Sequence, residues 1–484
     1  MQPESASGPD ATQRPGSEER PVRVAIIGSG PSGFYAAGAL LKADPVVEVD
    51  VFDRLPTPFG LVRGGVAPDH QKIKNVIRVY NKTAEHERFR FLGNVMVGRD
   101  LSVDDLLRHY DQIVYAVGNE SDRSMNVPGE ELEGVHSATE FVGWYNGHPD
   151  FQDRSFALDR ARRVAVVGNG NVAMDVARVL SQDLDVLAET DITDGALDAL
   201  RASTIEEIVI LGRRGPAQAA FSPKEIKELG ELEHAELVVE PAEARLDPLS
   251  AEWLESAAPS ARKNVEYLLE KSAETPSGSP AKRRICCRFL VSPTEFLGEG
   301  GKLTAVRIER NELTADRDGT PRPRGTGEHE TLEVDLVFKA VGYRGVPLQG
   351  VPFHERWGIF PNDEGRITDG PGGPVVPRQY VVGWAKRGPS GLIGTNGPDS
   401  QATVAKMLED VPALGEGAPE PSREAVDALL SRRGVDVVTF EDWQRLDEDE
   451  LARGSERGKV RDKYLSVDEM VEAVRRLRSQ AGVA

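Results

Sequence analysis

Cysteine is nearly absent from this chain of 484 residues, and the two that occur, Cys286 and Cys287, are neighbours. A disulfide between adjacent residues is strained and rare, so we expect no disulfide framework. Because no other cysteine occurs, a Cys-x-x-Cys redox pair, a cysteine-held iron–sulfur cluster and a cysteine-rich zinc site are also excluded. The sequence therefore predicts no metal site and no dithiol chemistry.

The chain also has no long apolar run and no excess of positive charge. No stretch approaches the roughly 18 apolar residues of a membrane span, so we expect no membrane insertion. Lys and Arg number 59 against 79 Asp and Glu, a net charge of −20. Such a field repels phosphate, so we expect no nucleic-acid binding by bulk charge. Residues 1–20 lack the apolar core of a secretory signal and are predicted to form a disordered tail, with a cytoplasmic location as the simplest expectation.

The first structured segment has the pattern of a β-α-β unit. An apolar strand is predicted at 22–27, followed by the turn GSGPSG, a helix pattern and a second strand that ends at Asp53. Gly28, Gly30 and Gly33 have the GxGxxG spacing, which lets a dinucleotide pyrophosphate approach the backbone at a helix N-terminus. A carboxylate at Asp53 would accept hydrogen bonds from a ribose 2′-OH and repel a 2′-phosphate. This turn therefore favours FAD or NAD.

The pattern of strand, glycine turn and helix then recurs. A strand at 163–167 precedes the turn GNGNVA, and the next strand ends in Arg213 and Arg214 instead of an acid. Two guanidinium groups could hold a 2′-phosphate by charge and paired hydrogen bonds, which favours NADP(H); the alternative is a solvated basic corner. The long spacing to this pair indicates an insertion at 182–204.

Two dinucleotide sites with opposite ribose preference predict a flavin relay, in which NADPH reduces the flavin and the flavin passes electrons onward. Outside these units, the Pro- and Gly-rich segment 55–70 and the charged segment 241–284 are both predicted to be irregular. About 70 residues at the end of the chain are charged and helix-prone, and we expect them to pack on the surface of the core domains.

Several longer blocks resemble one known family. The blocks, in chain order, are VAIIGSGPSGFYAA, LPTPFGLVRGGVAPDH, FRFLGNVMVG, VVGNGNVAMDVAR, LGRRGPAQAAF and VVGWAKRGPSGLIGTN. Together they resemble the adrenodoxin reductase family, which are ferredoxin–NADP(+) reductases of the glutathione-reductase-like structural class. The likeness is greatest to the actinobacterial members and extends from about Val22 to beyond Asn396.

The resemblance implies an α/β fold with two dinucleotide-binding, Rossmann-like domains. The NADP domain, predicted at 123–345, is inserted into a discontinuous FAD domain, predicted at 21–122 and 346–484 with a C-terminal helical tail. The strands that close on YAVG and AVGY are the expected crossing points between the domains.

The resemblance also implies an activity, that of an FAD-dependent ferredoxin/adrenodoxin–NADP(+) oxidoreductase. A hydride passes from NADPH to FAD, and single electrons then pass to a ferredoxin, an acidic iron–sulfur protein that could feed a cytochrome P450. Three alternatives stay open from the residues: an NADPH-dependent diaphorase or quinone reductase, a pyridine-nucleotide subunit of a larger complex, and a non-catalytic nucleotide-binding protein.

Site residues are implied by matching positions. For FAD they are Gly28, Gly30, Ser32, Gly33, Asp53, Leu61, Val97, Trp384, Gly391, Leu392 and Ile393; the family usually has Glu where Asp53 stands. For NADP they are Asn169, Gly170, Asn171, Val172, Arg213, Arg214, Glu225 and again Gly391. His70 and Glu228 are the candidate catalytic residues at the flavin–nicotinamide junction, with positioning and electrostatics as the expected role and proton delivery as the lesser one. From the pattern alone, His70 also fits a helix start and Glu228 a solvated helix face.

Because the chain is acidic overall, docking of an acidic ferredoxin would need a local basic patch. The candidate basic side chains are those of Arg63, Lys72, Lys74, Arg78 and the run 282–284.

Overall fold

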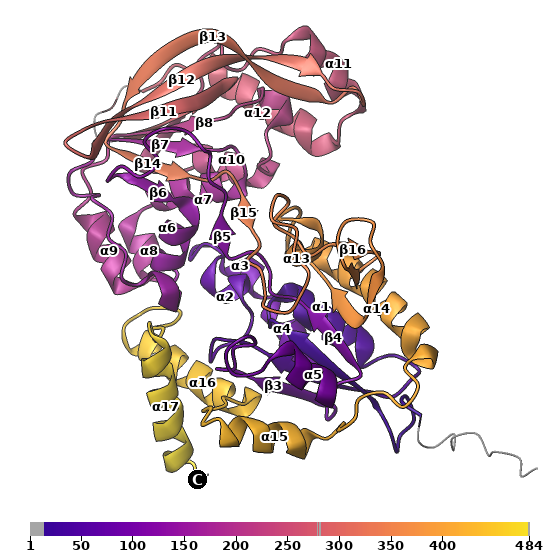
Figure 1. The fold of residues 1–484 in the computed structure, drawn as a ribbon. Helices are drawn as coiled ribbons and strands as arrows, with labels where there is room; N and C mark the ends of the chain where they lie inside the picture. The colour runs from indigo at the N-terminus through magenta and orange to yellow at the C-terminus, as the bar shows by residue number, and fades with distance from the viewer. Residues whose placement is uncertain (1–13, 278, 280–281, 483–484) are drawn as a thin grey trace, which may run out of the picture.

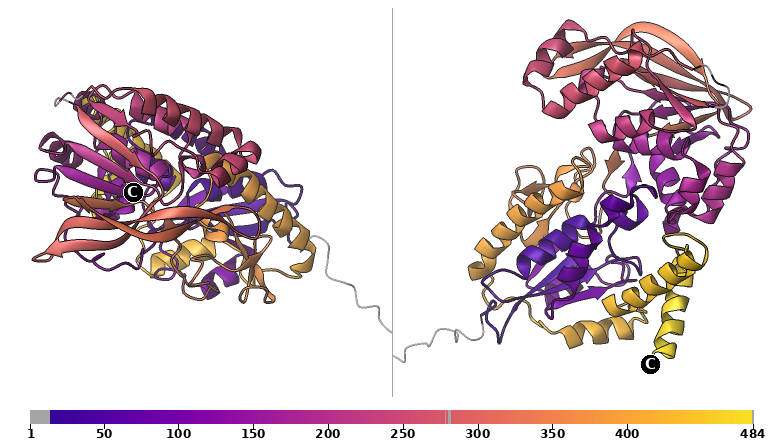
Figure 2. Two further views of the ribbon diagram at one scale, coloured as in Figure 1. Left: turned by 90° about the horizontal axis from the view of Figure 1, so that it is seen from above. Right: turned by 180° about the vertical axis from the view of Figure 1, so that it is seen from behind.

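The computed structural model describes residues 14–277, 279 and 282–482 (Figures 1 and 2). Residues 1–13 of the predicted disordered tail lie outside this part of the chain. Residues 14–20 differ from the prediction, because Arg20 donates two hydrogen bonds to Asp111, at 2.9 and 2.8 Å. The Gly16 N–H also donates to the Arg20 carbonyl at 2.7 Å, which closes a turn.

One part of the molecule, called the first half below, takes residues from both the N-terminal and the C-terminal parts of the chain. It is built on a seven-stranded sheet with the order β16-β17-β18-β4-β1-β2-β3. Its strands are β1 (Val22–Ile27), β2 (Val47–Phe52), β3 (Phe89–Leu92), β4 (Gln112–Tyr115), β16 (Asn362–Asp363), β17 (Arg366–Thr368) and β18 (Val375–Val381). The strands β18, β4, β1, β2 and β3 are parallel. Alternate residues of β1 enter two different hydrophobic clusters, as expected for a strand buried on both faces. Helix α1 (Pro31–Leu40) joins β1 to β2, which confirms the predicted β-α-β unit.

The other part, called the second half below, is formed by the middle of the chain. It contains a six-stranded parallel sheet with the order β6-β14-β7-β8-β10-β9. Its strands are β6 (Val135–Ser137), β7 (Arg163–Val167), β8 (Glu207–Leu211), β9 (Ala235–Val238), β10 (Arg283–Arg288) and β14 (Leu336–Lys339). One face packs against helices α6 (Ala138–Tyr145), α7 (Asn171–Val179) and α10 (Pro223–Gly230). The other packs against an antiparallel sheet formed by β11 (Val291–Glu299), β12 (Lys302–Ala315) and β13 (Pro321–Glu333), seen at the top of Figure 1.

The chain passes between the halves twice, and the two crossing segments pair with each other. β5 (Ser121–Asp122) and β15 (Tyr343–Arg344) form an antiparallel pair, which Figure 1 shows between the halves. All six strands of the second sheet thus come from residues between these two strands. The exact domain limits, 21–122, 123–345 and 346–484, stay a prediction.

Two segments predicted to be irregular contain helices. Within 241–284 the structure has α11 (Pro248–Ser256), α12 (Pro259–Ala273) and the start of β10. The reason is a sparse apolar stripe on α12, where Ala261, Val265 and Leu268 are buried although the segment as a whole is charged. Within 55–70 a short helix, α2 (Leu61–Gly64), follows the glycine at position 60.

The remaining helices complete the two halves. In the first half they are α3 (Gln71–Lys74), α4 (Ile77–Ala84), α5 (Val103–His109), α13 (Trp384–Arg387) and α14 (Asn396–Asp410). In the second half, α8 (Leu184–Ala188) and α9 (Asp194–Arg201) occupy the predicted insertion. Among all helices in the described part of the chain, none combines the length and apolarity that crossing a bilayer requires.

The C-terminal residues form α15 (Arg423–Arg432), α16 (Phe440–Glu456) and α17 (Val467–Gln480), which lie along the outside of the first half (Figure 1). This confirms the helix-prone, surface-packed tail. Trp443 and Leu446 of α16 are buried in the cluster that also holds α1. The turn after α16 reaches the second half, where the Lys459 ammonium donates to the Ile192 carbonyl at 2.7 Å.

A buried carboxylate on α16 anchors this tail. Glu450 is fully buried and accepts from Arg63 at 2.6 and 2.8 Å, from Arg461 at 2.8 Å and from the Tyr464 N–H at 3.0 Å. Burial opposes ionisation, but the charges of Arg63 and Arg461 outweigh it and hold the pKa of Glu450 below its usual value. Removing the carboxylate would leave the Arg63 guanidinium without its carboxylate partner, whereas Arg461 would keep its ion pair with Asp447 at 2.6 Å.

We therefore expect Glu450→Ala to lower the free energy of unfolding by about 3–5 kcal/mol, the typical cost of breaking a buried ion pair from one side. Denaturant unfolding of the purified protein measures it. Glu448 is exposed on the same helix, and Glu448→Ala, the control, should change the value by less than about 0.5 kcal/mol. Equal effects of the two variants would contradict the anchoring role of Glu450.

Candidate functional site

The first glycine turn divides its three glycines between two tasks. Gly28 has φ 106°, and a Cβ there would lie 2.5 Å from the Ala116 carbonyl oxygen. A Cβ on Gly33 would overlap the Gly28 carbonyl oxygen, so this glycine permits the close packing of α1 on β1. Gly30 faces open space, since a Cβ added there would have no protein atom within 4 Å. Two glycines therefore serve packing, and the third leaves room for a ligand.

The helix that follows this turn begins without a side-chain cap. Gly30 is the N-cap residue of α1 and Pro31 follows it. Free N–H groups and the positive end of the helix dipole thus point at the open space beside Gly30. This arrangement suits a pyrophosphate.

Asp53 lies beside the same turn. Its carboxylate accepts from the Ser29 N–H at 2.9 Å and from the Ser29 hydroxyl at 2.5 Å, and its other oxygen accepts from the Leu55 N–H at 2.9 Å. These contacts hold the acid at the carboxyl end of β2, next to the glycine turn, where a ribose hydroxyl is expected.

A third segment packs against the turn from the C-terminal part of the chain. A side chain on Gly383 would overlap the Ser32 hydroxyl, so Gly383 lies directly on the start of α1. The Trp384 ring lies 5.3 Å from that of Tyr343, and its indole N–H is buried with no acceptor among the described residues. A buried donor of this kind fits a site completed by a bound flavin.

The other FAD candidates lie at different depths. Val97 is buried at 5% exposure, Leu61 is 36% exposed and Leu392 is 61% exposed. Gly391 has φ 84°, where a side chain would overlap Thr395, and Ile393 begins a single helical turn. The segment 391–393 is therefore a fixed turn at the surface of the first half.

The second glycine turn repeats the design of the first. Gly168 has φ 129°, and a side chain there would overlap the Ala340 carbonyl; Gly170 again has no protein atom within 4 Å of an added Cβ. Gly170 is the N-cap of α7 and provides no side-chain cap. The Asn169 amide has a buried NH2 group with no acceptor among the described residues. The Asn171 side chain is already engaged, because its oxygen accepts from the Ser222 N–H at 2.8 Å.

Val172, the last residue predicted at this turn, is partly buried against the helix cluster of the second half.

The arginine pair forms a positive corner at the carboxyl end of β8. Arg213 is exposed and Arg214 half-buried, and neither has an ion pair with a carboxylate in the described part of the chain. Burial, and then the charges of Arg213 and Arg322, lower the pKa of Arg214. The backbone is held in place, since the Asn311 amide donates to the Arg213 carbonyl at 2.9 Å. Two unneutralised guanidinium groups on a fixed backbone suit an anion.

The two candidate catalytic residues, which are far apart in the sequence, are in contact. His70 precedes α3 in the first half and Glu228 lies on α10 in the second, and the His70 Nε2 is 2.9 Å from a Glu228 carboxylate oxygen. Burial raises the pKa of Glu228, but hydrogen bonds from His70 and Lys224 outweigh it and hold this pKa below its usual value. The pair therefore bridges the two halves of the molecule.

Glu225 lies in the same cluster, and no hydrogen bond or ion pair of the described residues joins it to the arginine pair. It is 6% exposed and accepts from Arg178 Nη1 at 2.9 Å. Burial, and then the charge of Asp175, raise the pKa of Glu225.

Sequence reasoning missed Arg178. The available signal was a lone cation among the apolar residues of the α7 segment NVAMDVARV.

The structure also limits the predicted docking residues. Lys72, Arg78, Lys282 and Arg284 are exposed, but the Arg63 guanidinium is held by the buried Glu450. Lys74 is 7% exposed and is held by Asp191 at 2.7 Å. Arg63 and Lys74 are therefore wrong as docking candidates, because each charge is neutralised inside the protein.

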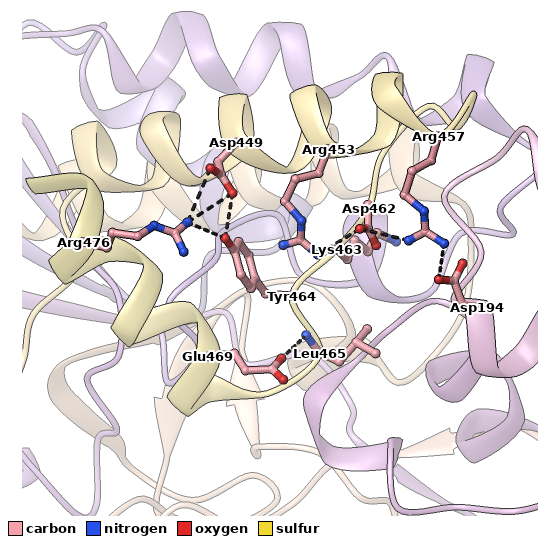
Figure 3. Close-up of a pocket in the computed structure, with 10 residues that line it drawn as sticks. All are labelled: Asp194, Asp449, Arg453, Arg457, Asp462, Lys463, Tyr464, Leu465, Glu469 and Arg476. Atoms are coloured by element: carbon pink, nitrogen blue, oxygen red, sulfur yellow. Dashed lines mark hydrogen bonds and ion pairs between the residues drawn. The ribbon is translucent and has the colours of Figure 1, made fainter. Parts of the chain in front are cut away.

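A pocket of about 530 Å³ lies elsewhere, where the turn between α16 and α17 meets the second half (Figure 3). Its charged side chains face one another: Arg457 donates to Asp194 at 2.5 Å, Arg453 to Asp462 at 2.9 Å, and Arg476 to the Tyr464 hydroxyl at 2.8 Å. None of the predicted site residues lines it, and its charges are already paired.

Comparisons with known proteins agree with this geometry. The model of the pyridine nucleotide-disulphide oxidoreductase family matches residues 22–192. NADPH-ferredoxin reductase FprA of Mycobacterium tuberculosis is 46% identical over 462 residues, covering 93% of this chain and 99% of that protein. The mitochondrial NADPH:adrenodoxin oxidoreductase of Homo sapiens is 40% identical over 480 residues, covering 97% and 95%. The solved structure of Mycobacterium tuberculosis FprA in complex with NADPH superposes with a TM-score of 0.88 at 45% identity, covering 94% of this chain and all of that one.

The division of tasks within the first turn predicts opposite outcomes for two alanine substitutions. Gly33→Ala should destabilise the apo-protein by about 1–3 kcal/mol, because the added methyl group has no room. Gly30→Ala should change its stability by about 1 kcal/mol or less, yet lower the amount of dinucleotide bound. Denaturant unfolding of apo-protein and the flavin-to-protein absorbance ratio measure the two effects. A Gly30→Ala protein that retains full flavin would contradict the assignment of the open space.

Proposed function

The chain belongs to the family that contains the NADPH-ferredoxin reductase FprA and the NADPH:adrenodoxin oxidoreductases, and on this premise we propose its reaction and the roles of its residues. It is an FAD-dependent oxidoreductase that uses NADP(H) and reduces a ferredoxin-type iron–sulfur protein. One observation supports the relay above others. Each half has a glycine turn that leads into a helix without a side-chain cap, and one turn lies beside an acid while the other lies beside two unpaired arginines.

The first turn is the proposed site of FAD. The open space at Gly30 and the free N–H groups of α1 would receive the pyrophosphate, and Asp53 would accept from the adenosine ribose. The indole N–H of Trp384 is buried without an acceptor among the described residues, and Gly383 just before it packs on the start of α1, which supports a contact with the flavin ring system. Bound FAD supplies the conversion between a two-electron hydride and single electrons.

The second turn is the proposed site of NADPH. Gly170 and the uncapped start of α7 would receive its pyrophosphate, and Arg213 and Arg214 its 2′-phosphate. The orphaned Asn169 amide supports a further hydrogen bond at this turn.

His70 and Glu228 are proposed to orient the reacting rings and to set the local charge. Hydride transfer needs no protein base, but it needs two rings held face to face. A contact of 2.9 Å that joins a loop of the FAD half to a helix of the NADP half supports such a positioning role. Glu225, held by Arg178, contributes to the same cluster, and its contact with NADP stays a prediction.

The electron acceptor is an iron–sulfur protein of the kind named for the relatives. An acidic ferredoxin that feeds a cytochrome P450, and a cytoplasmic location, are finer predictions. The exposed Lys72 and Arg78 on neighbouring helices of the first half support docking of an acidic partner there, against the net charge of the chain.

The purified protein should show flavin absorbance that bleaches on anaerobic addition of NADPH and recovers when an oxidised acidic ferredoxin is added. Stopped-flow absorbance follows both steps, and a quinone in place of the ferredoxin is the comparison. Bleaching followed by transfer to the quinone alone would favour a diaphorase. A protein without flavin absorbance, even after incubation with FAD, would overturn the relay.

The arginine pair predicts the choice of nicotinamide nucleotide. Because each charge-assisted hydrogen bond contributes about 1.5–3 kcal/mol, Arg213→Ala and Arg214→Ala should each raise KM for NADPH at least about tenfold while leaving KM for NADH within about threefold. Arg160 lies before β7 with its side chain 67% exposed, and Arg160→Ala is the matched control. An equal rise in KM for both nucleotides would contradict the assignment of the arginine pair to the 2′-phosphate.

A further inference from the structure

The carboxamide of Asn119, which has no role in the function proposed above, is buried without a hydrogen-bond partner. Asn119 lies between β4 and β5 and is 3% exposed. Neither its side-chain nitrogen nor its side-chain oxygen has a partner among the described residues. Burying an amide without partners is costly, because it loses its hydrogen bonds to water and gains none in return. Such a group is expected where a ligand completes the site.

Asn119 follows a strand whose carboxyl end lies beside those of its neighbours. The Ala116 N–H donates to the Ile27 carbonyl at 2.7 Å, which joins the ends of β4 and β1. The Val382 N–H donates to the Tyr115 carbonyl at 3.1 Å, which joins the ends of β18 and β4. In open α/β sheets, ligands bind beyond the carboxyl ends of the strands. Asn119 therefore lies at the edge of the sheet that carries the first glycine turn.

The strand order places Asn119 between two parts of the proposed FAD site. In the order β18-β4-β1-β2, β4 lies between β18, which precedes Trp384, and β1, which precedes the glycine turn. Asp53 follows β2, on the far side of β1. Neighbouring strands are about 4.8 Å apart. Asn119 is thus closer to the proposed sites of the flavin ring and the pyrophosphate than to that of the adenosine ribose.

Open space adjoins the backbone next to Asn119. A Cβ on Gly118 would have no protein atom within 4 Å, as was found for Gly30. Gly118 has φ 68°, a conformation that glycine adopts without strain. A ligand can therefore approach the chain closely at this point.

The Asn119 amide and the Trp384 indole N–H lie along the same crossing segment. A Cβ on Gly345 would lie 3.2 Å from the side-chain oxygen of Asn119, so the missing side chain at Gly345 leaves room for the amide. Gly345 follows β15, which contains Tyr343, and the Tyr343 ring lies 5.3 Å from the Trp384 ring. Two buried polar groups without partners therefore face the same part of the molecule.

The chemistry of a carboxamide narrows the choice of ligand group. It offers a donor and an acceptor at once. A pyrophosphate has acceptors only and would leave the amide oxygen without a partner. The part of FAD between the pyrophosphate and the ring is the ribityl chain, and each of its hydroxyl groups can both donate and accept.

We propose that Asn119 binds FAD, with its carboxamide hydrogen-bonded to hydroxyl groups of the ribityl chain. The inference rests on the proposed placement of FAD at the first glycine turn. The ribityl hydroxyl groups supply the partners that the amide lacks in the protein alone. Asn119 thus determines how tightly FAD is held and takes no part in hydride transfer.

Titration of the apo-protein with FAD, followed by flavin fluorescence, tests the contact. Asn119→Ala should raise Kd for FAD about tenfold or more, because two neutral hydrogen bonds contribute an effect of this size. The midpoint of denaturant unfolding of the apo-protein should stay near the wild-type value, since the amide has no partner there. An unchanged Kd would overturn the proposal.

Gln112 provides the matched control, because it has a buried amide at the other end of β4. Its side-chain nitrogen donates to the Met407 carbonyl at 2.8 Å and to the Tyr380 hydroxyl at 3.2 Å. Gln112→Ala should therefore lower the unfolding midpoint of the apo-protein and leave Kd for FAD within about threefold of the wild-type value. An equal rise in Kd in the two variants would overturn the proposal.

Analogues of FAD identify the group that the amide contacts. Three analogues, each lacking one ribityl hydroxyl group, are compared with one that carries hypoxanthine in place of adenine. At least one deoxy analogue should bind the wild-type apo-protein about fivefold or more weakly than FAD, and Asn119→Ala should remove that difference. The proposal is overturned if all deoxy analogues bind like FAD, or if Asn119→Ala removes a difference only for the hypoxanthine analogue or for none.

These measurements separate this inference from the proposed function. A wild-type protein that binds no FAD would overturn both the proposed flavin site and the role of Asn119. If the wild-type protein binds FAD and Asn119→Ala binds it equally well, only the role of Asn119 is overturned.

Discussion

The chemistry of this fold requires the two halves to keep one relative position, and buried ion pairs between them provide that constraint. Asp191 of the second half accepts from Lys74 of the first half at 2.7 Å and from Lys463 of the C-terminal segment at 2.8 Å. All three are nearly fully buried, and burial lowers the pKa of Lys463 to about 7 despite the nearby Asp191 charge. Buried ion pairs recover little stability after desolvation, but they permit few alternative geometries. The junction must bring two reacting rings into contact. Buried ion pairs therefore fix the relative position of the halves more closely than an apolar contact would.

The same constraint explains why the two nucleotide turns are built alike although their sequences differ. In each turn, the first glycine fits under a neighbouring carbonyl and the middle one faces open space. At the third position, Gly33 in one turn and the buried Ala173 in the other, a small residue lets the helix pack closely on its strand. Packing alone therefore fixes where each helix N-terminus points. The side chains at the end of the next strand determine which nucleotide is selected. Asp53 and the Arg213–Arg214 pair occupy equivalent places in the two units and differ in charge.

How far the sequence could predict this structure depended on the range of the interactions involved. The strands β1, β2, β7 and β8, the two glycine turns and the helix-prone tail follow from local patterns and were predicted correctly, whereas the antiparallel strands β11, β12 and β13 were not predicted. The 2.9 Å contact of His70 with Glu228 was expected only through the family resemblance, because no local pattern links residues 158 positions apart. The burial of Arg63 and Lys74 could not be predicted, since their partners, Glu450 and Asp191, come from distant segments. The helices of 241–284 were missed because few apolar residues on α12 suffice when the partner surface is already formed.

Charge in this protein is informative where it is left unpaired. The chain carries 79 acidic residues, and the buried arginines of the junction are each held by carboxylates, as Arg178 is by Asp69, Asp175 and Glu225. In an acidic chain with so many available partners, two adjacent guanidinium groups without a carboxylate in the described residues are a costly arrangement unless an anion completes them. The same reasoning separates Arg213 and Arg214 from Arg63, whose charge is satisfied internally. In such a protein, the absence of a carboxylate partner is therefore the better sign that a basic residue binds an anion. The number of basic residues on the surface is a weaker sign.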